Sequence, residues 1–244
     1  ISKELYFTLC DFYIASSSKS YLLMNKYYDY CSVDSLKQII YAGARFVELD
    51  IFRKGLNDDE NFPVVTNGIE KGEWKLCLNE LCFKTCLETI RDHALDTNLT
   101  PGNNNPFILY LNININSKLD KEVLKKSIAD NNISPEYKDK HGDYIFYNKI
   151  ANTIKEVFKS NDKLLSSQYN IKNEHNMKQT HSPIQLENIS KFKGKIIIMS
   201  NVSGSCSELM QYINLVCPKD VTMNRDLFSL RSYTHKEFAG IYDI

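Results

Sequence analysis

The amino-acid sequence predicts an α/β fold on a parallel sheet, because short apolar strands alternate with amphipathic helical segments. Residues 45–52 (RFVELDIF) and 107–111 (FILYL) are apolar runs of strand length, and residues 33–44 and 81–95 carry apolar side chains at helical spacing. The chain has 244 residues, which is enough for one α/β barrel or for one to two ordinary domains.

Turn and helix-end signals divide these elements. Gly43 favours the end of the first helix, and the breaker cluster 100–106 (TPGNNNP) separates the second helix from the strand at 107. The expected order is a strand at 9–15, a helix at 33–44, strands at 45–52 and 63–66, a helix at 81–95, a strand at 107–111, helices at 118–130 and 147–160, a surface loop at 168–182, a short helix opened by Pro183, and a strand at 194–200.

Composition excludes several classes of function. The 30 basic and 30 acidic residues balance, so nothing favours nucleic acid as a partner. No apolar run approaches the roughly 18 residues of a transmembrane helix. The seven cysteines include no C-x-x-C pair that would suggest a zinc site, and reduced thiols are favoured over a small loop closed by Cys77 and Cys82.

The pair Glu48 and Asp50 is the most informative local feature. Residues two apart in a strand point to the same side, so both carboxylates share one face. Unpaired carboxylates are costly in a parallel strand that is buried on both faces. The pair therefore indicates either a cation or polar-ligand site, or a structural ion pair with Arg45 or Arg53.

Five stretches, in order, resemble one family. Residues 12–22 (FYIASSSKSYL) are similar to its S-S-S-H-N-T-Y-L motif, 44–50 (ARFVELD) to C-R-x-V-E-L-D, and 87–111 to I-R-D-x-A-F followed by P-V-I-L-S-L. Residues 186–198 resemble L-K-G-K-I-L-L, and 207–212 (SELMQY) resemble the start of the next region. The chain is thereby identified as similar to phosphoinositide-specific phospholipase C, with an X-like region at 1–203 and the start of a Y-like region at 204–244.

This resemblance implies a TIM-barrel-like α/β fold, a phospholipase C-like phosphodiesterase barrel that is incomplete within this chain. In the family, two histidines perform acid–base catalysis, and a calcium ion is held by Asn, Glu, Asp and Glu. Glu48 and Asp50 match the central calcium ligands. The first histidine position falls on Ser18, and the calcium-binding asparagine position falls on Lys19.

The remaining family positions have also changed. The second histidine position falls on Asn67, with Glu73 and Leu78 as alternatives, and the last calcium carboxylate falls on Asn112. The phosphate-binding lysines fall on Met199 and Asn201. Because residues 1–92 contain no histidine, neither catalytic histidine is present. The histidines of this chain, at His93, His141, His175, His181 and His235, are expected to be structural or surface residues.

These departures predict a pseudoenzyme that lacks catalytic residues, with Lys19 pairing with Glu48 or Asp50 in place of a metal. No cofactor is expected, or calcium if the family site survives. Other protein chains are the expected partners, with an inositol phosphate or phosphoinositide headgroup as a second possibility, and a cytoplasmic or membrane-peripheral location is favoured. The alternatives are an active phosphodiesterase with a metal site reorganised around Glu48 and Asp50, and a structural component of a large assembly.

Overall fold

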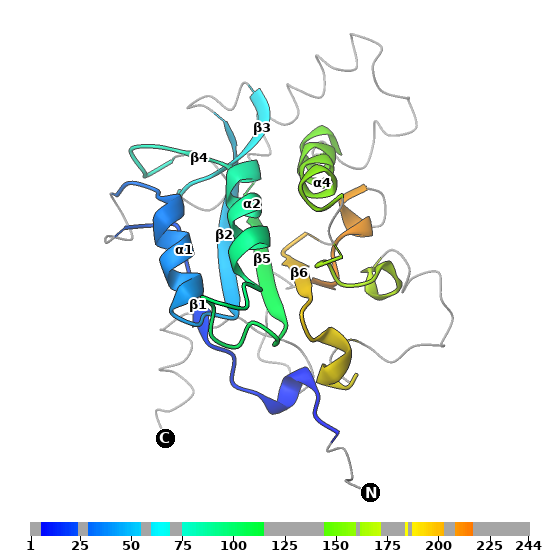
Figure 1. Ribbon diagram of the computed structural model, residues 1–244. Helices are drawn as coiled ribbons and strands as arrows, with labels where there is room; N and C mark the ends of the chain where they lie inside the picture. The colour runs from blue at the N-terminus through cyan, green and yellow to red at the C-terminus, as the bar shows by residue number, and fades with distance from the viewer. Residues whose placement is uncertain are drawn as a thin grey trace, which may run out of the picture.

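The structure is a computed structural model that describes residues 6–23, 29–54, 60–68, 75–114, 144–159, 162–171, 184, 187–202 and 208–216. Within them lies one mixed sheet in the order β4-β3-β2-β5-β6-β7, with β1 also paired to β2 (Figure 1). The strands are β1 (Ser16–Ser17), β2 (Phe46–Lys54), β3 (Glu60–Val65), β4 (Leu81–Cys82), β5 (Phe107–Ile113), β6 (Ile196–Ser200) and β7 (Leu215–Val216).

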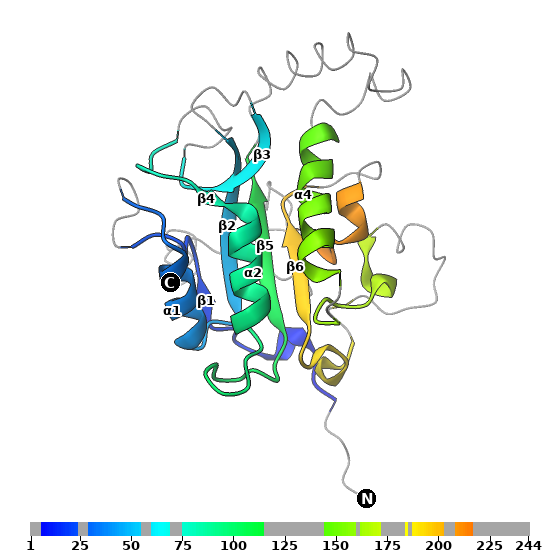
Figure 2. The same ribbon diagram turned by 45° about the horizontal axis from the view of Figure 1, so that its top comes forward.

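Five strands of this sheet are parallel and follow one another in chain order, β1-β2-β5-β6-β7. The longer helices, α1 (Val33–Tyr41), α2 (Phe83–His93) and α4 (Tyr144–Phe158), all lie on one side of the sheet (Figures 1 and 2). Sequential parallel strands with helices on one side are the arrangement of a TIM barrel. The described residues therefore form an incomplete TIM-barrel-like fold.

The two faces of the sheet bury different clusters. Val47, Leu49 and Leu109 alternate onto the outer face and belong to the core beneath the helices, which includes Leu36 and Ile90. The inner face carries a second, smaller cluster: Leu9, Phe46, Ile108, Tyr110, Leu165, Tyr169, Ile184, Phe192, Ile197, Met199 and Leu215. Short 3-10 helices complete both clusters. The inner cluster includes residues of η1 (Leu9–Asp11), η3 (Ser167–Tyr169) and η5 (Ile189–Phe192), and the core beneath the helices includes residues of η6 (Glu208–Gln211).

Most of the predicted elements are confirmed within a few residues. The first helix ends at Tyr41, where Gly43 has a φ of 99° that an L side chain rarely adopts. The helix predicted at 118–130 lies outside the described residues. Of the short helix predicted to open at Pro183, the structure describes only Ile184, which has 3-10 helical conformation; a separate 3-10 helix, η5, follows at Ile189.

Two strand predictions need correction. The segment 9–15 is not a strand; Leu9–Asp11 forms a 3-10 turn closed by hydrogen bonds between Thr8 and Asp11, and the strand begins at Ser16. The strand predicted at 63–66 starts at Glu60 and runs antiparallel to β2, so the sheet is mixed rather than parallel. β2 extends beyond its pairing with β5, which ends at Ile51, and β3 pairs antiparallel with the extension from Ile51 to Lys54.

The structure describes four cysteines as free thiols, namely Cys31, Cys77, Cys82 and Cys86, so the small loop from Cys77 to Cys82 is not closed by a disulfide. Burial and the neighbouring Cys77 thiol raise the pKa of Cys31 to about 12. Cys31 therefore stays protonated at neutral pH and is a packing residue, not a nucleophile. No helix among the described residues is long and apolar enough to span a bilayer.

Candidate functional site

The carboxyl ends of the parallel strands bring the predicted polar residues together. Register pairs Glu48 with Tyr110 and Asp50 with Asn112. Because Phe46 and Tyr110 belong to the inner cluster, alternation places Glu48, Asp50 and Asn112 on the same inner face. The inner face is therefore apolar at the amino end and polar at the carboxyl end.

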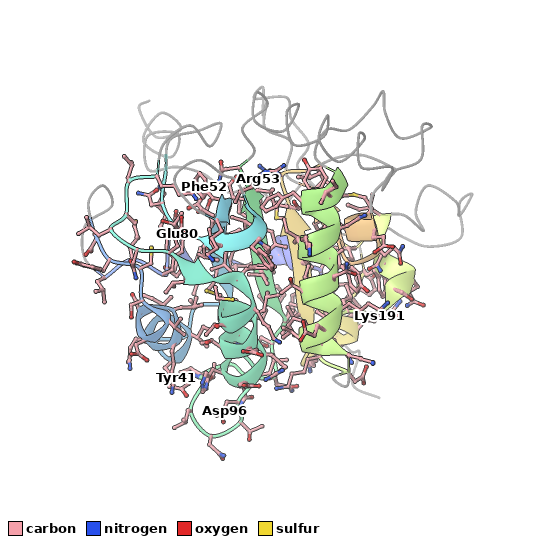
Figure 3. The ribbon with its side chains drawn as sticks, turned by 90° about the horizontal axis from the view of Figure 1, so that it is seen from above. Tyr41, Phe52, Arg53, Glu80, Asp96 and Lys191 are labelled. Carbon is pink, nitrogen blue, oxygen red and sulfur yellow. The ribbon has the colours of Figure 1, made fainter. Side chains whose placement is uncertain are left out.

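Figure 3 looks onto this carboxyl end. Phe52 and Arg53 at the end of β2 lie near the rim together with Glu80, whereas Tyr41 and Asp96 lie on the helical side of the sheet. Arg53 is buried against the Phe146 ring on the outer face, so it is not the structural partner of Glu48 or Asp50.

The turn after β1 delivers Ser18 and Lys19 to this end. Pairing of Ser17 with Val47 fixes the approach of the turn to β2. The Ser18 hydroxyl then donates a 2.7 Å hydrogen bond to Glu48 Oε2. Lys19 has a φ of 52°, in the left-handed region that disfavours most residues other than glycine and asparagine.

Lys19 does not form the expected salt bridge. Its ammonium donates a hydrogen bond to the Asn67 amide oxygen, directly after β3. Among the described residues, no nitrogen–oxygen contact within 4.0 Å joins Lys19 to Glu48 or Asp50. Its charge nevertheless acts on both carboxyls from a greater distance and partly offsets the rise in their pKa that burial causes. The turn geometry therefore places the ammonium beside the carboxylates and bonded to an amide.

Both oxygens of Asp50 accept hydrogen bonds from the protein. The buried Tyr21 hydroxyl donates to Oδ2 at 2.5 Å and also lies 3.0 Å from the Thr66 carbonyl oxygen. The Asn112 amide donates to Oδ1 at 2.6 Å. A carboxylate at position 112 would have no hydrogen to donate, so a cation would be needed to bridge it to Asp50. The Asn112 amide bonds to Asp50 directly and needs no such cation.

The hydrogen bonds continue from Asp50 across the sheet. The Asn201 amide donates to Asn112 Oδ1 at 3.0 Å, and its own oxygen accepts from the Ile113 backbone at 2.9 Å. Met199 is buried in the inner apolar cluster. One of the two family lysine positions is thus used in this polar network and the other in packing.

Burial governs the ionisation of the acidic pair. It raises the pKa of Glu48, and the charge of Asp50 adds to this, while Ser18 and Lys19 oppose it. Burial also raises the pKa of Asp50, against hydrogen bonds from Tyr21, Asn112 and Asn114 and the charge of Lys19. The two carboxyls are therefore harder to ionise than exposed ones, as expected where no strong counter-charge touches them.

This donor set does not fit calcium. Calcium requires six to eight oxygen ligands, usually with several carboxylates. Four family ligands, Asn, Glu, Asp and Glu, would carry three negative charges. The matching residues here carry a net single negative charge, because Lys19 adds a positive charge and Asn112 removes a negative one. Within the described part of the chain, no group of three His, Cys, Asp or Glu side chains could hold a metal ion.

The possible second-histidine positions are placed differently. Asn67 is 1% exposed and contacts Lys19 inside the site, whereas Leu78 is 68% exposed on a loop whose backbone pairs with Asp29. Glu73 lies outside the described residues. His93 lies on α2, where its Nδ1 is 2.8 Å from the Tyr41 hydroxyl, and the other four histidines lie outside the described residues.

Two members of the network were not predicted as such from sequence. Tyr21 lies in the first motif (residues 12–22) without a predicted role, and Asn201 was predicted only to stand at a family lysine position. A buried tyrosine needs a partner for its hydroxyl, but sequence gives no means of choosing Asp50 among the available acceptors.

Comparison with known proteins gives a consistent assignment. The family model for "Phosphatidylinositol-specific phospholipase C, X domain" matches residues 6–133, just over half of the chain. The 1-phosphatidylinositol 4,5-bisphosphate phosphodiesterase 1 of Saccharomyces cerevisiae is 30% identical over 129 residues, covering 52% of this chain and 13% of that protein. The Drosophila melanogaster 1-phosphatidylinositol 4,5-bisphosphate phosphodiesterase is 36% identical over 86 residues, covering 35% and 7%.

Solved structures show the same fold. Crystal structures of L. pealei PLC21 and S. officinalis PLC21 match with TM-scores of 0.57 and 0.52, each at 17% identity. The first match covers 89% of this chain and 25% of that chain, and the second covers 86% and 24%. The present chain thus spans only a small part of each protein that it resembles.

Proposed function

The chain belongs to the phosphatidylinositol-specific phospholipase C X-domain family, and we propose that it is a pseudoenzyme of this family that serves as a protein-binding or assembly module. The observation that carries the proposal is that the chain's own side chains bond both carboxylate oxygens of Asp50. Tyr21 and Asn112 occupy its two oxygens, where a catalytic metal site would keep them for the cation.

The absence of an acid–base pair supports the same proposal. Ser18 and Asn67 stand at the two histidine positions, and neither takes up a proton at neutral pH. A well-placed general base typically contributes about 10²–10⁴ in rate, so the loss of two leaves little of the family's hydrolysis. Ser18 instead serves Glu48 as a hydrogen-bond donor.

Three exposed apolar side chains at the carboxyl end of the barrel, here called the apolar rim, support the binding role. Leu23, Tyr30 and Leu78 are 52%, 54% and 68% exposed. Backbone hydrogen bonds from Leu23 to the Tyr30 carbonyl and from Leu78 to the Asp29 carbonyl hold their loops together. Exposed apolar groups that lie together are typical of interaction surfaces.

Calcium calorimetry combined with a hydrolysis assay tests the pseudoenzyme. The native sequence is expected to give no binding heat at millimolar calcium and no hydrolysis of phosphatidylinositol above buffer. The double variant Lys19→Asn/Asn112→Glu, which restores the family ligand types, is the matched comparison and is expected to gain a calcium heat. Calcium binding by the native sequence that disappears in Glu48→Gln, together with hydrolysis, would instead establish an active phosphodiesterase.

Photocrosslinking in cells tests the binding role. A photoreactive residue at position 78 is expected to capture a defined protein, whereas one at Leu99, which is 58% exposed on the loop after α2, is not. Equal labelling at both positions, or none at either, contradicts a binding surface at the rim. Capture of several different chains at position 78 would favour a structural component of a large assembly.

A further inference from the structure

A second concave site lies at the amino end of the barrel, opposite the carboxyl-end network. A cavity of about 370 Å³ is enclosed by the segment before β1 and by residues that precede β2 and β5. Its walls are mainly apolar, with Phe12, Ile14, Ile108 and Ile189 among the lining residues. Its volume falls in the range of small-molecule sites.

The only charged residues in the lining are two cations, Arg45 and Lys193, within the part of the chain that the structure describes. Lys193 is exposed and forms no ion pair with another described residue. An apolar cavity bordered by cations alone favours an anionic ligand.

The charge of Arg45 is buried and lacks a carboxylate partner among the described residues. The side chain is 8% exposed, and Nε and Nη1 donate to the carbonyls of Ala44, Ala94 and Gly102. Nη2 is buried without a hydrogen-bond partner. Burial lowers the pKa of Arg45, which reflects the missing counter-charge. The guanidinium lies over the Phe107 ring in the core beneath the helices, so its charge acts on the cavity from behind the wall and favours an anion there.

We propose that this amino-end cavity binds a small molecule with one carboxylate on an apolar body, such as a medium-chain or aromatic acid. The apolar walls take up the body of the ligand. Lys193 pairs with the carboxylate at the opening, and Arg45 contributes its charge from within the wall without direct hydrogen bonding. One accessible ammonium matches a monoanion better than a phosphate group, which favours several convergent donors.

Calorimetric titration with decanoate tests the site, with decanamide as the uncharged ligand of equal length. Decanoate is expected to bind with a dissociation constant below about 1 mM, and the amide at least fivefold more weakly. Lys193→Glu is expected to weaken decanoate binding about five- to tenfold. Ala15→Trp, which fills the opening from an exposed position, is expected to abolish it.

The matched control is Lys155→Glu, the same charge change at an exposed lysine of α4, which is expected to leave decanoate affinity unchanged. No binding by the native chain up to 10 mM overturns the proposal, with about 10 mM taken as the limit of specific affinity. Binding that survives Ala15→Trp moves the site elsewhere and equally overturns it. Equal affinity for the amide removes the anion requirement. None of these results bears on calcium binding or hydrolysis at the other end of the barrel.

Discussion

At the carboxyl end of the barrel, Asp50 is buried with each of its oxygens bonded to a side-chain donor. At the amino end, Arg45 is also buried, but its charge meets backbone carbonyls and the Phe107 ring rather than a carboxylate, and one nitrogen has no hydrogen-bond partner. The first charge is bonded by its own chain at both oxygens, so a ligand would have to displace or share these donors. The second is compensated only in part, so a ligand can still lower its energy. Within this chain, the residues that match the family's site lie at the carboxyl end of the barrel, and the cavity that we propose as a binding site lies at the amino end.

The largest change in stability is expected when the Arg45 charge at the amino end is removed. Arg45→Ala is expected to lower the free energy of unfolding by about 3–4 kcal/mol, because charge-assisted hydrogen bonds to Ala94 and Gly102 disappear and those carbonyls lose their donor. Urea denaturation measures the change. Lys37→Ala, which loses only a contact with the Tyr41 ring, should change stability by no more than about 0.5 kcal/mol. A loss below about 1 kcal/mol for Arg45→Ala would mean that this charge is solvated.

The carboxyl end is tested next by Tyr21→Phe. The variant removes one donor from Asp50 without changing the packing of the ring, and it is expected to destabilise the protein by about 1–3 kcal/mol. Tyr13→Phe serves as the control, since Tyr13 is fully exposed and its hydroxyl should not matter. Equal stabilities of Tyr21→Phe and the native chain in thermal and urea melts would contradict a stabilising hydrogen bond from Tyr21 to Asp50.

Substitutions at Lys19 test its backbone conformation, with a smaller expected change in stability. The order of glycine and alanine should be the reverse of that in a helix. Lys19→Gly is expected to be about 1 kcal/mol more stable than Lys19→Ala, because both lose the bond to Asn67 and only glycine suits a φ of 52°. At Lys37, inside α1, the same pair should show the opposite order, with alanine favoured by about 1 kcal/mol. If alanine is favoured at both positions, the turn is not left-handed.

The smallest effect is a change in pH dependence. A carboxyl with a raised pKa keeps its proton longer in the folded state, so its contribution is greatest at low pH and is lost as pH rises through that pKa. Glu48→Gln removes this contribution while Ser18 still finds an acceptor. The stability of the native chain should therefore fall more steeply than that of the variant as the pH rises above the ordinary glutamate pKa of about 4.3. The difference should be a fraction of the about 1.4 kcal/mol per pH unit given by one proton. Parallel profiles would place the Glu48 pKa near its ordinary value.

Sequence patterns predicted the alternating strands and helices because the two have distinct periods, whereas the barrel was implied by the family resemblance. The buried strand 107–111 and the helix 81–95 are runs in which propensity and burial agree. The strand prediction at 9–15 failed because the segment is an almost continuous apolar run of strand length, while a local bond from Thr8 to Asp11 folds its start into a turn. The antiparallel course of β3 was not predicted because apolar content does not encode strand direction.

At the site, sequence reasoning located the residues but not all of their contacts. Glu48, Asp50 and Asn112 share a face because side chains alternate along a strand. The bond from Lys19 to Asn67 depends on a left-handed turn and on the return of β3, which join residues 48 positions apart. Electrostatics alone favoured a carboxylate partner for Lys19, and backbone geometry selected an amide.

The left-handed backbone at Lys19 also bears on evolutionary reversibility. The turn retains a conformation that a short amide side chain occupies more readily than a lysine, as if the backbone had not been remodelled around its present occupant. The change of ligand types at positions 19 and 112 is thus confined to side chains on an intact frame. The double variant Lys19→Asn/Asn112→Glu would therefore introduce the family's ligand types without requiring a new backbone conformation at residue 19.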